Sequence, residues 1–254
     1  MANKGKDNAT SLPHAAPPKD GSLERRTPAP SPAGRSSDAD VGAFVAHLKQ
    51  LPATGKRGGR LIFAMDATMS RQPTWDMALA LQADMFAAVA AIGGLEVQLV
   101  YFRGAGECRA SKWVAKPEAL AALMTRVSCA GGYTQIRKVL SHAYGEATEH
   151  AVDALIYVGD AMEEAIDDLC GRAGELALRK VPVFLFQEGT DQRAERAFRE
   201  IARLTKGAYC RFDAGSAAQL KALLAAVAVY ATGGRPALAA RNDAAARRLI
   251  EQLK

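Results

Sequence analysis

Short apolar runs alternate with longer amphipathic stretches along most of this chain. The runs have the length and hydrophobicity of strands that are buried on both faces. They cover residues 61–65, 95–102, 152–158, 181–186 and 208–212, and a further strand is expected over 107–115. Between them, apolar residues recur every three or four positions, as on one face of a helix. This alternation predicts an α/β fold, with a doubly wound, mainly parallel sheet and helices on both faces.

Composition divides the chain into four parts. Residues 1–40 are rich in Pro and Ala and too poor in large apolar side chains to offset chain entropy, so we expect a disordered arm. Residues 41–60 are predicted to form a short amphipathic helix and a Gly-rich linker. Residues 61–232 are predicted to form the α/β domain. Residues 233–254 begin with two consecutive glycines and are predicted to form a helical tail.

The net charge of +6 is unevenly distributed. Residues 1–60 carry 10 Lys and Arg against 5 Asp and Glu, and residues 235–254 carry 5 against 2. The stretch between them therefore has a net charge of −2. A nucleic-acid-binding groove would place its basic residues on the folded part of the chain. We therefore expect no nucleic-acid partner.

The cysteines and the apolar runs bear on the cellular compartment. The four cysteines are widely spread and form no CxxC pair, and the N-terminal residues lack the apolar segment of a signal peptide. We find no run that approaches the roughly 18–20 apolar residues of a membrane span. These features predict a cytoplasmic protein with reduced thiols and no membrane contact.

Oxygen-bearing side chains follow several of the predicted strands. Asp66, Thr68 and Ser70 come directly after the first strand, Thr134 ends a Gly-Gly loop, and Asp160 follows the strand 152–158. In open α/β sheets, ligands bind at the carboxyl ends of the strands. Carboxylates and hydroxyls are ligands that suit a hard cation such as Mg²⁺. The sequence therefore predicts a metal site formed by these residues.

Their order and spacing resemble a known motif. Asp66-x-Thr68-x-Ser70, a Gly-Gly-x-Thr loop at Thr134 and Asp160 after an apolar strand are similar to the metal-ion-dependent adhesion site of von Willebrand factor A (VWA) domains. The resemblance implies that Thr68 and Ser70 bind Mg²⁺ or Mn²⁺ directly, and the other three directly or through water.

The resemblance also implies a function. Such a site leaves a coordination position open for an Asp or Glu of a partner protein, so the chain would be a binding module and not an enzyme. Related intracellular modules serve chaperone or AAA+ ATPase assemblies, which makes such an assembly a possible partner by analogy.

The chain departs from the family pattern at several positions. Thr68 replaces the commoner Ser, and Met69 stands where small residues are usual. Arg71 replaces an apolar residue and offers a salt bridge to an acidic ligand. Asp160 is flanked by Gly and Ala instead of the usual Thr and Gly. One alternative is therefore the same fold with a degenerate site that holds no metal.

A second alternative is a haloacid-dehalogenase-like phosphohydrolase. Asp66 would be the nucleophile, Thr134 the phosphate-binding hydroxyl and Lys180 the basic residue, with the metal near Asp160 and Glu163 or Glu164. This class places a second carboxylate two residues after the nucleophile as a general acid. Thr68 occupies that position, so the binding module is favoured. Trp75, near the first loop, fits either an exposed anchor for a partner or a core residue.

Overall fold

The computed structural model describes residues 58–213 and 216–253, which form an α/β domain. The predicted disordered arm, the predicted helix and the first part of the predicted linker lie outside these residues. The sheet has the order β3-β2-β1-β4-β5-β6, in which β3 alone runs antiparallel to its neighbour. The strands are β1 (Gly59–Asp66), β2 (Leu95–Arg103), β3 (Glu107–Ala110), β4 (Ala154–Gly159), β5 (Val183–Glu188) and β6 (Ala208–Phe212).

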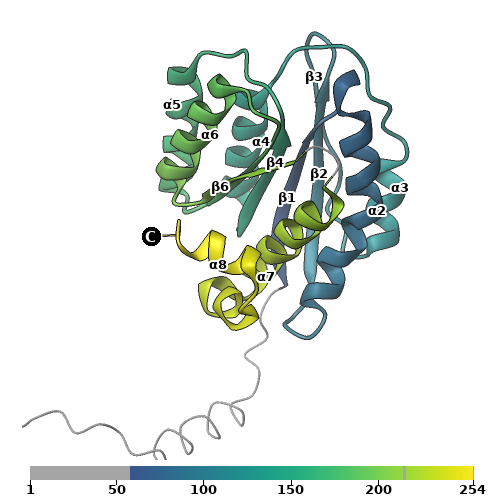
Figure 1. Ribbon diagram of the computed structural model, residues 1–254, viewed down its shortest axis with the longest axis vertical. Helices are drawn as coiled ribbons and strands as arrows, with labels where there is room; N and C mark the ends of the chain where they lie inside the picture. Colours follow the sequence, from purple (N-terminus) through teal and green to yellow (C-terminus); the bar gives the residue numbers. More distant parts are fainter. Residues whose placement is uncertain (1–57, 214–215, 254) are drawn as a thin grey trace, which may run out of the picture. The chain divides into compact units, whose positions relative to one another are not determined.

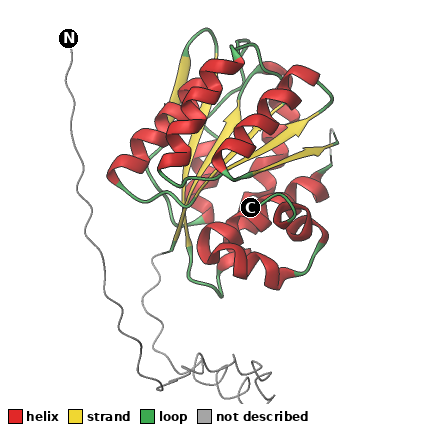
Figure 2. Ribbon diagram, turned by 90° about the vertical axis from the view of Figure 1, so that its left-hand side faces the viewer, coloured by secondary structure: helices red, strands yellow, loops and turns green. Residues whose placement is uncertain are grey.

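Helices cover both faces of the sheet (Figures 1 and 2). One face carries α2 (Gln72–Val89), α3 (Pro117–Met124), α7 (Ala217–Arg241) and α8 (Ala244–Ile250). The other carries α4 (Ile136–Glu149), α5 (Ile166–Leu178) and α6 (Gln192–Thr205). A short 3₁₀ turn, η1 (Met69–Arg71), precedes α2. The predicted doubly wound α/β fold is confirmed.

The alternation of side chains along the strands explains the two layers. In β1, Leu61 and Phe63 belong to the core beneath α2 and α7, whereas Ile62 and Ala64 belong to the core beneath α4 and α5. Every residue of β1 is buried. A strand covered on both faces must be apolar at successive positions, which is why the sequence shows runs and not an alternating pattern.

Several predicted boundaries need correction. β1 begins at Gly59, so the last two residues of the predicted linker belong to the sheet. A side chain at position 59 would meet the backbone of Ala231 at 2.6 Å, which requires glycine. The third strand ends at Ala110, and only an isolated bridge between Val97 and Val114 continues the pairing.

The chain after residue 232 packs on the domain. Helix α7 leaves helical geometry at Gly234, where φ is 67°, and continues to Arg241. Leu238, Leu249 and Leu253 are 0%, 0% and 5% exposed and belong to the same core as the sheet. The residues that the sequence predicts as a tail are therefore helical and contribute apolar side chains to the core. Whether 61–232 folds without them stays a prediction.

Helix α7 is longer and more apolar than the sequence analysis allowed for. Its most apolar 18-residue window has a mean hydropathy of 1.3, which by length and composition would also suit a membrane span. Within the fold, 56% of that window is buried, and α7 packs against α2 and β1. Its hydrophobicity therefore has an explanation in the core.

We expect Leu249→Ala to lower the free energy of unfolding by about 2–4 kcal/mol, because it removes a fully buried side chain and leaves a cavity. Leu178→Ala, at a position that is 84% exposed, is the matched control and should change stability by less than about 0.5 kcal/mol. Urea unfolding of both variants measures the difference. Equal stability of the two would show that α8 does not unfold with the domain.

Candidate functional site

The loops that carry the predicted metal ligands meet at the point where the direction of sheet winding reverses. From β1 the chain proceeds to β2 on one side, and later returns as β4 on the other side. The crevice outside the carboxyl ends of β1 and β4 is thus the topological switch point, where ligands bind in open α/β sheets. Asp66 is the last residue of β1, and Asp160 directly follows β4.

All five residues of the predicted metal site line one cavity at this edge. The cavity has a volume of about 220 Å³, and its lining includes Asp66, Thr68, Ser70, Thr134 and Asp160. The remaining lining residues are Met69, Gly131, Gly132, Ala161 and Glu163. The structure therefore brings the predicted residues together, whereas their role as metal ligands stays a prediction.

The first loop turns sharply to present its three polar side chains. The buried carboxylate of Asp66 accepts a hydrogen bond from the backbone N–H of Thr68 at 2.7 Å. The hydroxyl oxygens of Thr68 and Ser70 are 3.4 Å apart. The backbone N–H of Ala67 donates to the carbonyl of Phe102 at 3.0 Å, which anchors the loop to the end of β2. The Asp-x-Thr-x-Ser spacing thus places one carboxylate and two hydroxyls beside the same cavity.

The acidic residues after β4 hold the Thr134 loop. The backbone N–H of Thr134 donates to the carboxylate of Glu163 at 2.8 Å, and the backbone N–H of Glu163 donates to the Thr134 hydroxyl at 3.1 Å. The Glu164 carboxylate accepts from the backbone N–H groups of Ile136 and Arg137 at 2.5 and 3.0 Å. It therefore caps the N-terminus of α4, which favours negative charge. Sequence spacing alone gave no sign of these long-range contacts.

The turn between β2 and β3 supports the other side of the Thr134 loop. The backbone N–H of Tyr133 donates to the carbonyl of Gly104 at 3.2 Å, and Gly104 and Gly132 form an isolated bridge. A Cβ atom at Gly132 would lie 2.3 Å from the backbone nitrogen of Gly104. This close approach of two backbones is the reason for glycine in the Gly-Gly-x-Thr loop.

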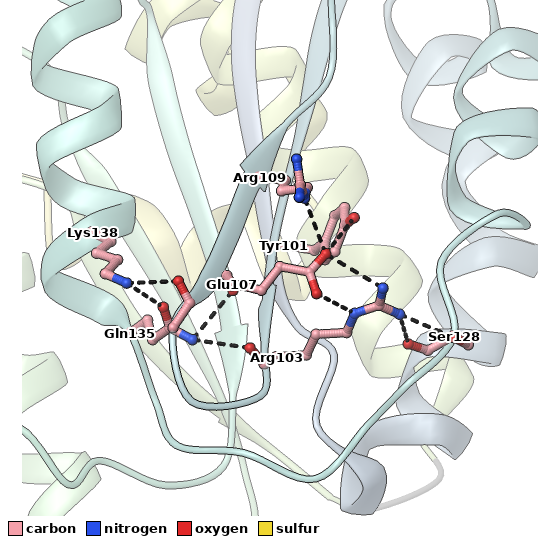
Figure 3. A network of polar contacts seen from close by, with 8 residues as sticks. Tyr101, Arg103, Glu107, Arg109, Ser128, Gln135 and Lys138 are labelled. Carbon is pink, nitrogen blue, oxygen red and sulfur yellow. Dashed lines mark hydrogen bonds and ion pairs between the residues drawn. The ribbon is translucent and has the colours of Figure 1, made fainter.

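A polar network continues this support (Figure 3). Glu107 accepts hydrogen bonds from Tyr101, Arg103 and Arg109, and the bond from Arg103 lowers the pKa of Glu107 below its ordinary value. The side-chain amide of Gln135 donates to the backbone carbonyls of Arg103 and Glu107 at 3.1 and 3.2 Å. Because Gln135 follows Thr134 directly, the network fixes the position of the Thr134 loop relative to the β2–β3 hairpin.

Arg71 is the internal cation of the site. Its guanidinium pairs with the carboxylate of Asp160 at 3.1 Å and also with Glu188, the last residue of β5. The hydroxyl of Thr74 donates to the same carboxylate of Glu188. The sequence analysis noted Arg71 but missed Glu188. The available signal was an acid at the end of an apolar strand, which is also the position of Asp66.

Burial changes the ionisation of both aspartates. Burial raises the pKa of Asp66 from 3.8 to about 6, although the hydrogen bonds from Thr68 oppose the shift. Burial also raises the pKa of Asp160, against the effect of Arg71. The nearby carboxylate of Asp160 adds to the cost of ionising Asp66. A cation placed between the loops would relieve this cost.

The donor set fits a hard divalent cation. Within residues 58–213 and 216–253, no group of three His, Cys, Asp or Glu side chains could hold a metal ion, so a site here needs the hydroxyls of Thr68, Ser70 and Thr134. Two carboxylates with three hydroxyls offer oxygen alone, which suits Mg²⁺ or Mn²⁺ and not soft ions. One contact counts against metal binding by all five residues, because the carboxylate of Asp160 already pairs with Arg71.

A buried tyrosine explains one departure from the family pattern. The hydroxyl of Tyr157 on β4 has no hydrogen-bond partner among the described residues, although the residue is 1% exposed. A Cβ atom at Gly159 would lie 2.8 Å from this hydroxyl. The ring therefore occupies the space that the usual Thr side chain would need before Asp160.

Exposed apolar side chains belong to the loops that line the cavity. Only three large hydrophobic residues among the described ones are classed as exposed, and two of them are Met69 and Tyr133, at 65% and 67%. Met69 stands between Thr68 and Ser70, and Tyr133 directly precedes Thr134. Apolar groups of this size next to a polar cavity are typical of protein-binding surfaces.

Two residues that the sequence analysis considered do not belong to the site. Trp75 is 1% exposed, and its indole N–H donates to the carbonyl of Met124 at 3.3 Å, so it is a core residue and not an anchor. Lys180 lies between α5 and β5, at the amino ends of the parallel strands. It is therefore at the opposite end of the sheet from Asp66, and the phosphohydrolase alternative lacks its basic residue beside the proposed nucleophile.

Comparison with known proteins supports the fold. No family model and no curated protein sequence matches the chain. The SpRpn10 VWA domain superimposes with a TM-score of 0.53 at 9% identity, over 67% of this chain and 95% of that one. The pilus adhesin SpaC from Lactobacillus rhamnosus GG gives 0.52 at 12% identity, over 68% of this chain and 30% of that one. An aerotolerance-related membrane protein from Bacteroides fragilis gives 0.50 at 17% identity, over 65% and 95%.

These likenesses show that the domain has the VWA fold, as the sequence motif predicts. At these identities they bear on the fold alone. VWA folds are often protein-binding modules, and the metal site of this chain stays a prediction.

We expect Asp66→Asn to raise the free energy of unfolding without metal by roughly 1–3 kcal/mol at pH 7.5, since the amide keeps the bond from Thr68 and carries no buried charge. The raised pKa of Asp66 means that the wild type loses stability as the pH rises from 3.8 to about 6. The advantage of the variant should therefore be absent near pH 3.8 and complete above pH 6. Urea unfolding in EDTA across this range measures it. A variant less stable than the wild type at pH 7.5 would contradict the prediction.

Proposed function

We propose that this protein is a binding module that holds an acidic side chain of a partner protein through Mg²⁺ or Mn²⁺ at the cavity between β1, β4 and the Thr134 loop. The observation that carries the proposal is the convergence of five oxygen-bearing side chains from three loops on one cavity of about 220 Å³. The partner would present Asp or Glu, and by analogy with related intracellular modules it would belong to a chaperone or AAA+ ATPase assembly in the cytoplasm.

Each part of the site has a distinct role in this proposal. Asp66 and Asp160 would supply charge to the cation, and the hydroxyls of Thr68, Ser70 and Thr134 would complete its ligands. The bound ion supplies positive charge and an open position for a carboxylate. The protein positions these groups beforehand, because Thr68 orients the Asp66 carboxylate and Glu163 holds Thr134 on both its N–H and its hydroxyl.

Electrostatics explains why an acidic partner would need the cation. Asp66, Asp160, Glu163 and Glu188 all lie at or beside the cavity, and Arg71 is the basic residue paired with two of them. Negative charges therefore outnumber positive ones, and an approaching carboxylate is repelled. A divalent ion would offset two of these negative charges and would offer the carboxylate an open coordination position, which makes partner binding conditional on the metal.

A metal-independent module is the second candidate, and a specific contact favours it. The guanidinium of Arg71 reaches Asp160 at 3.1 Å, so a cationic group of the protein already neutralises one predicted ligand. Arg71 is held by two carboxylates and its side chain is only 13% exposed. In this version the fold keeps a protein-binding surface at Met69 and Tyr133, and the oxygen cluster has a structural role.

We expect Mg²⁺ and Mn²⁺ to raise the melting temperature of the wild type, and Zn²⁺ not to do so. An ion in ten- to hundredfold excess over its Kd should stabilise the native state by about 1–3 kcal/mol. Asp66→Asn and Ser70→Ala should remove the response. Asp84→Asn, which deletes a carboxylate on α2 that pairs with Lys221, is the matched control and should retain it. The same response in wild type and Asp66→Asn would show that Asp66 is not a ligand.

Arg71→Met separates the two candidates. Removing the guanidinium leaves Asp160 and Glu188 without their cation, so we expect the metal-free variant to be destabilised by roughly 3 kcal/mol. In the metal-dependent version Asp160 becomes free for the ion, and the variant should bind Mn²⁺ more tightly than the wild type by calorimetry. Arg71→Lys keeps the charge and should bind like the wild type. If none of the three proteins binds Mg²⁺ or Mn²⁺, the metal-independent module is the correct one.

A further inference from the structure

The edge strand β6 has an unusual partner. β6 pairs with β5 on one side and forms the outer edge of the sheet on the other. There, the backbone N–H of Tyr209 donates to the side-chain carbonyl of Gln252 at 2.8 Å, and the side-chain amide of Gln252 donates to the Tyr209 carbonyl at 2.9 Å. A carboxamide carries the same donor and acceptor as a peptide group. Gln252 therefore pairs with β6 as one residue of a neighbouring strand would.

The pairing covers one residue of the edge and leaves the next one open. Backbone groups along a strand alternate in direction, so the N–H and carbonyl of Arg211 face the same way as those of Tyr209. Among the described residues, no hydrogen bond reaches them from outside the sheet. An unpaired edge of this kind can accept an added strand.

A hollowed surface follows this edge. One cavity, of about 520 Å³, lies between the end of α6 and the residues after α8, and its lining includes Gly207, Tyr209 and Gln252. A second, of about 330 Å³, also borders Tyr209 and Gln252 and extends to Arg211. Together they form a groove from Gly207 to Arg211, which we call the β6 groove. Figure 1 shows α8 next to β6 at this edge.

The β6 groove is basic. Its lining contains five basic side chains, Arg199, Arg203, Lys206, Arg211 and Arg248, against two acidic ones, Glu195 and Glu251. Arg199 and Arg203 pair with glutamates on their own helix, at 2.8 and 2.5 Å. Lys206, Arg211 and Arg248 are exposed, and no acidic group among the described residues lies within ion-pair distance of them. The groove therefore favours a negatively charged occupant.

We propose that the β6 groove binds an extended acidic segment of a partner protein, which adds to the sheet as a strand beside β6 and displaces the Gln252 side chain. The segment would take over the two hydrogen bonds at Tyr209, pair with the open groups of Arg211, and place acidic side chains against Lys206, Arg211 and Arg248. Main-chain pairing gives affinity in this mode, and side chains give specificity. The proposal concerns a different edge from the candidate metal site and does not depend on it.

Other occupants fit these observations less well. A second copy of the chain at the same edge would bring the basic side chains of both copies together. A nucleic acid would match the charge but would make no use of the peptide-like pairing at Tyr209. A third explanation is that the Gln252 pairing and the basic side chains only protect the edge of the sheet against aggregation. This explanation predicts that the groove binds no ligand.

The test is fluorescence anisotropy of the full chain with a labelled peptide of alternating Glu and Val. We expect this peptide to bind, and the same peptide N-methylated at alternate residues to bind at least about tenfold more weakly, since it loses several ladder hydrogen bonds. Gln252→Ala should tighten binding by about three- to tenfold, because the peptide no longer displaces a bonded amide. Arg211→Glu should weaken it at least about tenfold. Arg196→Glu, an exposed position on α6 outside the groove lining, is the matched control.

Hydrogen exchange gives the location: the Arg211 amide should become protected when the peptide binds, in EDTA as well as in Mg²⁺. Equal affinity of the N-methylated peptide, or an unchanged Kd in Arg211→Glu, would overturn the proposal. So would loss of binding in EDTA, or displacement of the peptide by an oligonucleotide of similar affinity. Self-association of Gln252→Ala without peptide binding would show that Gln252 only protects the edge.

Discussion

Strand β1 imposes the constraint on which the site depends. Parallel neighbours pair with it along both edges, and helices bury both of its faces. Asp66 is its last residue and its only acid, 2% exposed at the border of the core. Because the chain leaves β1 on one side and returns through β4 on the other, the next carboxylate beyond that strand, Asp160, borders the same cavity. The sheet topology thus brings two carboxylates to one cavity, one of them buried and the other partly exposed.

The protein offsets this electrostatic cost with its own groups. The backbone N–H of Thr68 binds the Asp66 carboxylate, and the guanidinium of Arg71 spans Asp160 and Glu188. A planar guanidinium suits this task because it presents donors in a fixed fork. The compensation is incomplete, since the pKa of Asp66 remains raised to about 6 and the Nε of Arg71 has no partner among the described residues. Carboxyl groups with raised pKa values are often found in functional sites, and structural ion-pair networks also produce them.

The sequence allowed prediction of the features that local patterns encode. The spacing of apolar residues predicts the order of strands and helices. The acids at the end of the first strand and directly after the strand 152–158 predict which side chains reach the carboxyl edge of the sheet. Contacts between distant segments have no such local signature. The ion pair of Arg71 with Glu188 joins residues 117 positions apart. The hydrogen bond by which Glu164 caps α4 at Ile136 joins residues 28 positions apart. Residues 233–253 likewise needed the structure, because two glycines suggest a boundary even where the following helices dock on the core.

In the proposed binding mode, the exposed side chains of Met69 and Tyr133 would influence the strength of a charged contact at the cavity. Two unit charges 4 Å apart attract by about 1 kcal/mol in bulk water and by about 4 kcal/mol at the effective dielectric of a partly buried site. A partner that covers both side chains and the cavity would exclude water from the oxygen cluster, as apolar surroundings do at interface hot spots. The ionic and apolar contributions to such binding would therefore be coupled, and a free carboxylate would gain only the weaker interaction. In the proposed binding mode, the preferred ligand would be an acidic residue with apolar neighbours, and negative charge on a partner would by itself be insufficient for recognition.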